Sequence, residues 1–145
     1  MTSVLTRMVA RALLAPTLMV AAAILIKGYA DVGDGFAAGV VAALAVLTQF
    51  VAFGRDEVAR VLPIHHAPVV ALAGLAIGLA VLAVPMAFGG APLEHWPPPG
   101  EEPVHVGSLE LITAVAFDVG VFLLVVGVAV TIIDALAAPE MEEDG

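Results

Sequence analysis

Residues 67–93 read APVVALAGLAIGLAVLAVPMAFGGAPL, and no side chain in this run is charged. An α-helix rises about 1.5 Å per residue, so about 20 apolar residues cross the roughly 30 Å hydrocarbon core of a bilayer. The run is long enough for one such crossing. It therefore predicts a membrane-spanning helix, and it directs attention to other uncharged runs in the chain.

Three further runs have the same character. They are residues 12–26 between Arg11 and Lys27, residues 35–54 between Asp34 and Arg55, and residues 111–133, which only Asp118 interrupts. The first run is short, but its flanking basic side chains can snorkel to the interfaces and lengthen it. The sequence thus predicts an all-α integral membrane protein with four transmembrane helices. We place them at about residues 8–28, 35–54, 67–89 and 108–137, in a membrane domain of residues 1–138 that precedes an acidic tail, residues 139–145.

The composition supports a membrane protein and excludes other classes. Of the 145 residues, 61% are hydrophobic and 13% are charged, and the formal net charge is −9. A soluble domain of this length has too little interior to bury so much apolar surface. The acidic balance argues against a nucleic-acid partner, which needs basic patches. The chain has no cysteine, so disulfides and thiolate metal sites are excluded.

The basic residues predict the orientation of the helices. Arg7 and Arg11 precede the first span, and Arg55 and Arg60 lie between the second and third, whereas the opposite side has Lys27 alone. Because basic residues favour the cytoplasmic side, we expect both termini to be cytoplasmic. A cleavable signal peptide is the competing interpretation of the first span, although the glycine-rich segment after it argues against this.

Small residues indicate close contact between helices. G-x-x-x-G spacing places two glycines on one helix face and lets a neighbouring backbone approach. The glycines in question are Gly35 and Gly39 in the second span, Gly74 and Gly78 in the third, and Gly120 and Gly127 in the fourth. The pattern leaves open whether the packing partners are the chain's own helices or those of a neighbouring protein.

Asp118 is the most informative residue in the fourth span. A carboxylate at membrane depth costs several kcal/mol unless it is paired, hydrated or protonated. Its neighbours three and four residues away are Ala114, Val115, Val121 and Phe122, and none of them can satisfy it. A partner must come from another helix, another protein chain or water. Asp118 is then either a proton or cation relay, or half of a structural pair with a basic residue of a neighbouring chain.

The connection between the first two spans is rich in glycine and charge. Lys27 ends the first span, and Asp31, Gly33, Asp34 and Gly35 follow closely. Glycines permit unusual backbone dihedral angles, which suits a tight turn. The two carboxylates could attract a cation to the mouth of an ion path. The alternative is a hydrated hairpin with no role beyond joining two helices.

Several familiar catalytic and ligand-binding patterns are absent. The sequence has no phosphate-binding G-x-x-x-x-G-K loop, no G-x-S-x-G nucleophile and no metalloprotease histidine motif. His65 and His66 are adjacent and point in different directions on a helix, and no second ligand cluster accompanies them. We therefore expect no metal site, no cofactor and no enzymatic activity. A lone buried acid is too little for an autonomous ion pump, which favours a component of a larger transporter.

Two motifs resemble those of a known family. Residues 27–39, KGYADVGDGFAAG, resemble the G-H-x-x-P-G-G-G-F-x-x-G hairpin of the MnhB/MrpB family, and residues 117–122, FDVGVF, are similar to that family's F-D-I-G-V-Y. The family's four-span layout also matches. Tyr29 replaces the usual histidine, Val32 the usual proline and Asp34 the middle glycine. A histidine role at the hairpin therefore does not carry over to this chain.

The resemblance implies a particular assembly. MnhB/MrpB proteins are the B-type components of Mrp cation/proton antiporters, which consist of several different subunits and exchange cytoplasmic Na⁺ for external H⁺ across bacterial or archaeal plasma membranes. No cofactor is implied for this component. The implied partners are the A-, C-, D-, E-, F- and G-type subunits of the Mrp antiporter, especially the C-terminal part of the A-type one. The candidate ion-path residues are Asp118, Lys27, Asp34 and Asp31, although Asp34 adds a charge where the family usually has none. The candidate structural hairpin residues are Gly33, Gly35, Phe36 and Gly39. The alternatives are the equivalent component of a hydrogenase-like redox-driven pump and a purely structural scaffold.

Overall fold

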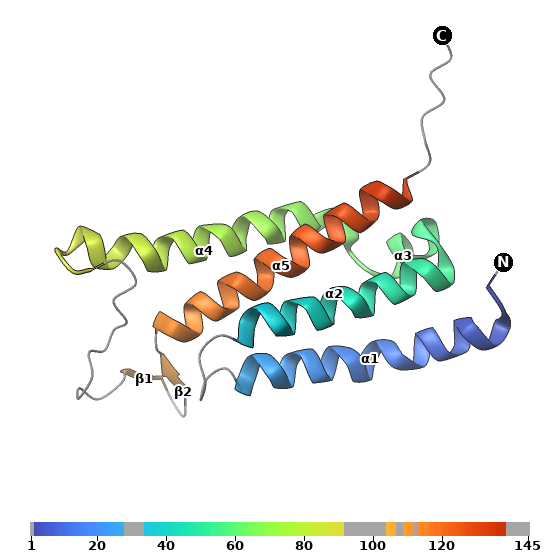
Figure 1. Ribbon diagram of the computed structural model, residues 1–145, viewed down its shortest axis with the longest axis horizontal. Coiled ribbons are helices and arrows are strands. Elements are labelled where there is room, and N and C mark those ends of the chain that lie inside the picture. The colour runs from blue at the N-terminus through green and yellow to red at the C-terminus, as the bar shows by residue number, and fades with distance from the viewer. Residues whose placement is uncertain (1, 28–33, 92–103, 107–108, 112, 139–145) are drawn as a thin grey trace, which may run out of the picture.

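The computed structural model describes residues 2–27, 34–91, 104–106, 109–111 and 113–138 (Figure 1). Its four long helices are α1 (Val4–Lys27), α2 (Asp34–Phe53), α4 (Ala67–Ala87) and α5 (Thr113–Ala137). Each is long and apolar enough to cross a membrane, the third together with the 3₁₀ turn η1 (Ile64–His66) that precedes it. The short helix α3 (Arg55–Val61) follows α2. The predicted all-α fold with four spans is confirmed.

The ends of two helices differ from the sequence expectation. Helix α1 begins at Val4 rather than near residue 8, and α5 begins at Thr113 rather than near residue 108. Residues 109–111 instead form strand β2, which pairs antiparallel with β1, residues 104–106. The alternation Leu-Glu-Leu in β2 suits the two-residue period of a strand. The fourth span is therefore shorter at its N-terminal end than its apolar run suggested.

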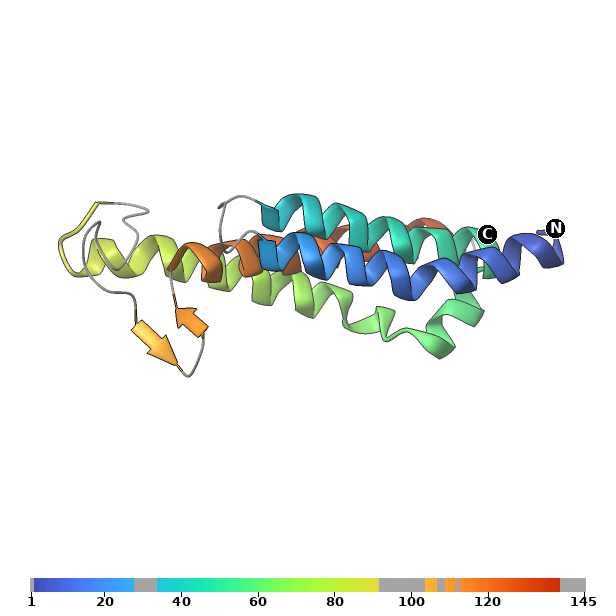
Figure 2. The ribbon, with the colours of Figure 1, turned by 90° about the horizontal axis from the view of Figure 1, so that it is seen from below.

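The four long helices stand in a row. Helix α1 packs against α2, α2 against α5, and α5 against α4, as the two ribbon views show (Figures 1 and 2). The last helix of the chain thus inserts between the second span and the third. Helices α1 and α4 form the two edges of the row. Helix α5 has a long helix on each side, which makes it the central element of the fold.

Glycines set the close approach of α5 to both of its neighbours. A Cβ atom at Gly127 would stand 2.7 Å from the carbonyl oxygen of Ala67, and one at Gly74 would stand 2.5 Å from that of Gly120. Ordinary carbon contacts lie near 3.5–4.0 Å, so a larger residue at either position pushes α4 and α5 apart. Gly78 differs, because no described heavy atom beyond the neighbouring backbone of its own helix lies within 4 Å of its Cβ position. The chain's own helices are therefore the packing partners of Gly74, Gly120 and Gly127.

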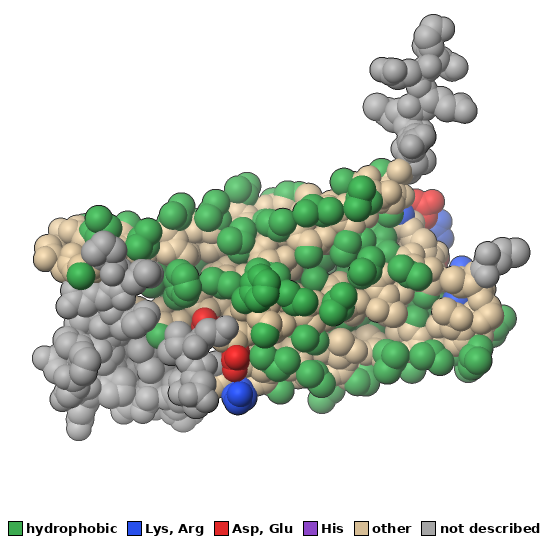
Figure 3. Space-filling model, viewed as in Figure 1, with side chains coloured by type: hydrophobic (Ala, Val, Ile, Leu, Met, Phe, Trp, Pro, Cys, Tyr) green, Lys and Arg blue, Asp and Glu red, His purple; other side chains and the backbone are tan. Residues whose placement is uncertain are grey.

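The exposed surface of the helices is largely apolar. Leu72, Leu79 and Val51 are among many large hydrophobic side chains with more than half of their surface exposed. In the face drawn in Figure 3, charged side chains lie toward the ends of the helices and hydrophobic ones cover the length between them. This arrangement suits a bilayer, where lipid rather than water meets the side chains.

Both ends of the described chain lie at the same end of the row, beside α3 (Figure 1). The reversal between α2 and α3 occurs at Gly54, whose φ of 83° lies in the left-handed region that favours glycine. Even-numbered crossings require this placement of the termini. Which side of the membrane they face remains a prediction from the basic residues.

Candidate functional site

Asp118 lies in the second turn of α5 and is buried. Only 4% of its surface is exposed, and among the described residues Gln49 is the one other polar side chain classed as buried. Because α5 begins at Thr113, Asp118 lies about 8 Å along the helix axis from its start. Asp118 is therefore closer to the N-terminal end of α5 than to its middle. The carboxylate is therefore within reach of one membrane interface.

The N-terminus of α2 packs directly on the backbone of Asp118. A Cβ atom at Gly35 would overlap the carbonyl oxygen of Asp118 and stand 2.9 Å from its carbonyl carbon and 3.0 Å from its Cα. Only glycine permits this approach. The first turn of a helix has unpaired N–H groups and the positive end of the helix dipole, both of which favour a nearby carboxylate. The start of α2 is thus a close neighbour of the Asp118 backbone within the same chain.

Asp118 is also not a bare buried charge. It has at least one interaction partner, and no buried side-chain nitrogen or oxygen of the described residues lacks a hydrogen-bond partner. Asp118 is therefore buried together with at least one interaction partner, and its carboxylate is not left unpaired in the packing.

An ion pair lies beside this crossing, where α1 ends and α2 begins. The Lys27 ammonium nitrogen is 3.7 Å from a carboxylate oxygen of Asp34, and their side chains are 69% and 30% exposed. Asp34 is in the first turn of α2, where the helix dipole favours an acid. An exposed pair of this kind contributes little stability. It does provide charge at the water-facing edge of the Asp118 site.

The fold brings four of the predicted site residues together. Lys27, Asp34, Gly35 and Asp118 meet where the end of α1, the start of α2 and the second turn of α5 converge. Gly39 packs one turn further along α2, where its Cβ position would lie 2.8 Å from the Cβ of Val125 and 3.2 Å from the Phe122 carbonyl oxygen.

One other predicted residue, Phe36, does not join that group. Phe36 is 61% exposed, so it faces outward and is not part of the helix contact. Asp31 and Gly33 lie outside the described residues, as does the acidic tail. The described part of the predicted site is therefore the crossing of α2 and α5 and the ion pair beside it.

The opposite end of the row holds an ion pair that the sequence analysis missed. Arg55 at the start of α3 donates from Nε to Oδ1 of Asp134 at 2.7 Å and from Nη2 to Oδ2 at 3.2 Å. The hydrogen bond to Asp134 and the charge of Asp134 raise the pKa of Arg55 above its usual value. A bidentate pair of this geometry fixes α3 against the end of α5. The sequence offers one indication of this pair: Arg55 and Asp134 each directly follow an uncharged run, and both are predicted to lie on the same side of the membrane.

Gln49 is the second residue that the sequence analysis missed. It is 6% exposed, and its Nε2 donates to the carbonyl oxygen of Ala10 at 2.7 Å, joining α2 to α1. The signal was an amide side chain inside an otherwise apolar run. Its position is 14 residues after Gly35 in the same helix, toward the other end of α2 from the Asp118 crossing.

The chemistry that this arrangement can support is limited. Within the described residues, no three His, Asp or Glu side chains gather where they could hold a metal ion. Asp118 is the buried acid of the described helices, and a carboxylate in this position can accept a proton or neutralise a cation. Binding and release of a small positive charge is therefore the function that the site can serve.

The fold and site together define a multi-pass α-helical membrane protein with a buried carboxylate on its central helix. Comparison with known proteins identifies its family. Residues 5–131 match the family model described as a domain related to the MnhB subunit of Na⁺/H⁺ antiporters, and the chain belongs to this family. The resemblance found in the sequence is thereby confirmed.

Individual relatives agree with the family model. The chain is 30% identical over 114 residues to a protein of Alkalihalophilus pseudofirmus that is named as the B subunit of a Na⁺/H⁺ antiporter, covering 79% of this chain and 78% of the relative. A Bacillus subtilis protein of the same name is 31% identical over 115 residues, covering 79% of each chain. Together with the four apolar helices, these relatives indicate a multi-pass protein of the plasma membrane.

A third relative is much longer than this chain. It is a Rhizobium meliloti protein named as the probable A/B subunit of a K⁺/H⁺ antiporter, and it is 34% identical over 119 residues. The match covers 82% of this chain and 12% of the relative. The named cation thus differs between relatives.

Proposed function

We propose that this chain is the B-type component of a transport complex that exchanges a monovalent cation, Na⁺ or K⁺, for H⁺. Within that complex it supports assembly and contributes Asp118 to the cation or proton path. The observation that carries this proposal is the burial of Asp118, at 4% exposure, against the N-terminus of α2. The family membership supplies the class of transport.

The position of Asp118 suits transient charge binding. At about 8 Å from the start of α5, the carboxylate is inside the helix row yet close to one aqueous interface. A carboxylate inside a membrane protein is a group that can take up a proton or balance a cation. The exposed Lys27–Asp34 pair lies at the edge from which ions would approach.

The open row of helices indicates that the path needs other proteins. Charged groups and ions within a membrane must be enclosed by protein or by a water-filled cavity. A row ordered α1, α2, α5, α4 leaves its two broad faces uncovered by long helices of the described chain. A neighbouring protein against one face would complete the enclosure around α5. This argument supports partners of the A, C, D, E, F and G types in the same membrane.

Contact with the A-type partner has the most specific support. The Rhizobium meliloti relative carries both letters, A and B, in its name, and this chain matches only 12% of it. If one chain contains both an A-like and a B-like part, these two parts must lie close together. We infer the same proximity for this chain, to the C-terminal part of its A-type partner.

A purely structural scaffold is the second candidate function. The observation in its favour is that Gly35 and Gly127 fit the backbones of neighbouring helices so closely that substitution would disturb packing. In a scaffold, the burial of Asp118 would serve helix packing alone. Antiport that survives neutralisation of Asp118, together with loss of assembly on replacing Gly35 by Leu, would favour this candidate.

Purification and reconstitution test the proposal. A tagged copy of the chain, extracted in mild detergent, is expected to bring down several other membrane proteins in fixed proportion. Vesicles that contain the complex should show cation-dependent proton movement, and vesicles with this chain alone should show none. Isolation of the chain without partners, or antiport by the chain alone, contradicts a role as one component of a complex.

A further inference from the structure

Two arginines at the N-terminal end of α1 converge on one aromatic ring. Arg7 and Arg11 are four residues apart, so they share a helix face. The guanidinium carbon of Arg7 is 5.5 Å from the centre of the Phe53 ring, and that of Arg11 is 5.1 Å away. Arg7 also donates from Nε to the carbonyl oxygen of Ala52 at 3.3 Å. Phe53 thus holds two positive groups close together on the surface of α2.

Neither guanidinium has an acid partner within the described chain. The ion pairs there are Lys27–Asp34, Arg55–Asp134 and Arg60–Glu57. Arginine has five donors, and the Ala52 carbonyl accepts one donor from Arg7. Two charges of the same sign repel each other, and their approach at a membrane edge is stabilised by an anion. Most of the donors of this arginine pair therefore remain available to a ligand.

A groove lies between the two arginines. It has a volume of about 280 Å³ and is lined by Val4, Arg7, Met8, Arg11 and Phe53. Val4 is 76% exposed and Met8 is 66% exposed, so apolar side chains flank the charged ones on the outer face of α1. A ligand that fits this groove is anionic at one end and apolar at the other.

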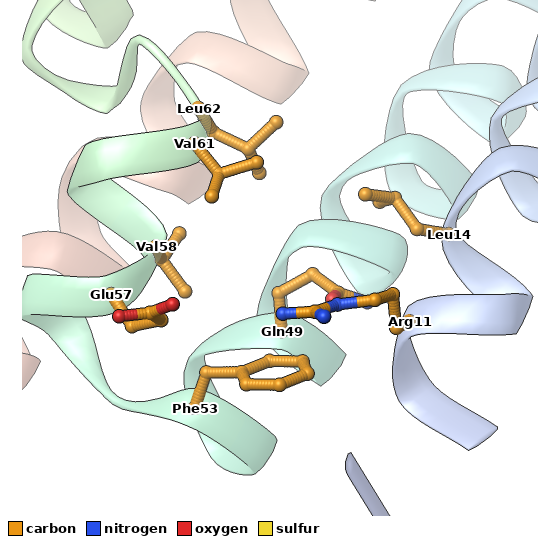
Figure 4. A pocket seen from close by; sticks show the side chains of 8 residues that line it. All are labelled: Arg11, Leu14, Gln49, Phe53, Glu57, Val58, Val61 and Leu62. Atoms are coloured by element: carbon orange, nitrogen blue, oxygen red, sulfur yellow. The ribbon is translucent and has the colours of Figure 1, made fainter. Parts of the chain in front are cut away.

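The Arg11 side chain also lines a second, smaller cavity. Figure 4 shows Arg11 reaching from α1 across the ring of Phe53, with Glu57 of α3 directed toward the same space. This cavity, of about 60 Å³, is lined by Glu57 but not by Arg7, whereas the larger groove is lined by Arg7 but not by Glu57. The Glu57 carboxylate is 3.7 Å from a guanidinium nitrogen of Arg60. An anion between Arg7 and Arg11 is therefore on the side away from Glu57.

The groove lies near the N-terminal end of α1, where a membrane-spanning helix can meet the headgroup layer. Arg11 lies about 10 Å along the axis of α1 from Val4, and the headgroup layers add roughly 5–7 Å to each side of the hydrocarbon core. Long arginine side chains at a helix end extend toward that layer. Basic pockets between helix ends are favourable sites for phospholipid headgroups.

We propose that the groove between α1 and α2 binds one anionic phospholipid. Its phosphate accepts hydrogen bonds from Arg7 and Arg11, its glycerol lies beside the exposed Met8, and its acyl chains run from there towards the membrane interior. The guanidinium fork matches the geometry of a phosphate group. The apolar side chains beside the arginines favour a lipid over free phosphate. The bound lipid would hold α1 against α2 at the end that also carries the Gln49–Ala10 hydrogen bond.

Lipid counting by native mass spectrometry tests this site. The probe is phosphatidylglycerol added to the delipidated antiporter complex, with phosphatidylcholine and inorganic phosphate as separate arms. Replacing both arginines, Arg7→Gln with Arg11→Gln, is expected to remove one tightly bound phosphatidylglycerol per copy of the chain and weaken its binding roughly 25-fold, about fivefold per arginine. Arg60→Gln is the matched control at the same end of the row, and it should leave lipid binding unchanged.

A photoreactive phosphatidylglycerol keeps the test independent of variant stability. In the unaltered complex it should label peptides that contain Met8, and excess inorganic phosphate should not displace it. Displacement by inorganic phosphate, or equal binding of phosphatidylcholine, overturns the anionic lipid. If the double variant loses a partner protein while keeping its lipid count, a carboxylate of that partner covers the arginines and the proposal is wrong.

Discussion

Replacement of Gly35 by Ala should loosen the crossing of α2 and α5. The added Cβ would overlap the carbonyl oxygen of Asp118 and stand 2.9 Å from its carbonyl carbon, where contacts near 3.5–4.0 Å are normal. The obstructing atoms are backbone, so the helices must separate rather than rotate a side chain. Overpacking of this kind costs about 1–3 kcal/mol, and the helix preference of alanine returns up to about 1 kcal/mol. We expect a net loss of roughly 1–2 kcal/mol.

Equilibrium unfolding of the purified protein in mixed detergent micelles measures this loss. Gly78→Ala is the control, because no described heavy atom beyond the neighbouring backbone of its own helix lies within 4 Å of its Cβ position, and its unfolding free energy should not fall. Gly127→Ala should be destabilised like Gly35→Ala, since its Cβ would stand 2.7 Å from the Ala67 carbonyl oxygen, but it leaves the surroundings of Asp118 intact. If Gly35→Ala is as stable as Gly78→Ala, the inferred backbone contact is wrong.

Three further predictions concern the remaining polar contacts. Arg55→Gln should increase hydrogen exchange in α3, because it removes the bidentate contact to Asp134; unchanged exchange would show that α3 is held by apolar packing alone. The pKa of Arg55 is raised, so the stability that its charge contributes should be lost only when the pH rises through that very alkaline value. Between neutral and mildly alkaline pH, hydrogen exchange in α3 should therefore stay constant after correction for the intrinsic pH dependence of exchange. In an unfolding titration, Gln49→Ala should cost about 1–3 kcal/mol, because it removes the hydrogen bond to Ala10 and leaves a space. Lys27→Ala should cost less than about 1 kcal/mol, because its ion pair is on the surface. The reverse order of costs would contradict the burial of Gln49 and the exposure of Lys27.

The four spans could be predicted from the sequence because length and apolarity are local properties. An uncharged run such as residues 67–93 has few structural alternatives once about 20 residues are needed to cross a bilayer. The start of the fourth helix was harder to place. The predicted span begins near residue 108, whereas residues 109–111 pair with residues 104–106 as a short strand. Strand pairing depends on a partner segment that helix length alone does not reveal.

The order of the helices and the partners of the site residues are long-range properties. The sequence identified Asp118 as a residue that needs outside help, but it did not indicate that Gly35 would lie against its backbone. G-x-x-x-G spacing predicts a close approach without naming the approaching helix, and it treats Gly74 and Gly78 alike although their surroundings differ. Arg55 and Asp134 are 79 residues apart, and no periodic pattern connects them.

Antiport measured in inverted membrane vesicles, with Asp118 replaced by Asn or by Glu, tests the central claim most directly. Asn keeps the shape of the side chain but cannot take up a proton or balance a cation, whereas Glu keeps the charge. With the protein composition of the complex matched to that of the unaltered one, we expect Asp118→Asn to lower cation-driven proton movement at least about tenfold and Asp118→Glu to retain part of it. Full antiport by an assembled Asp118→Asn complex would show that this buried carboxylate has no part in moving ions.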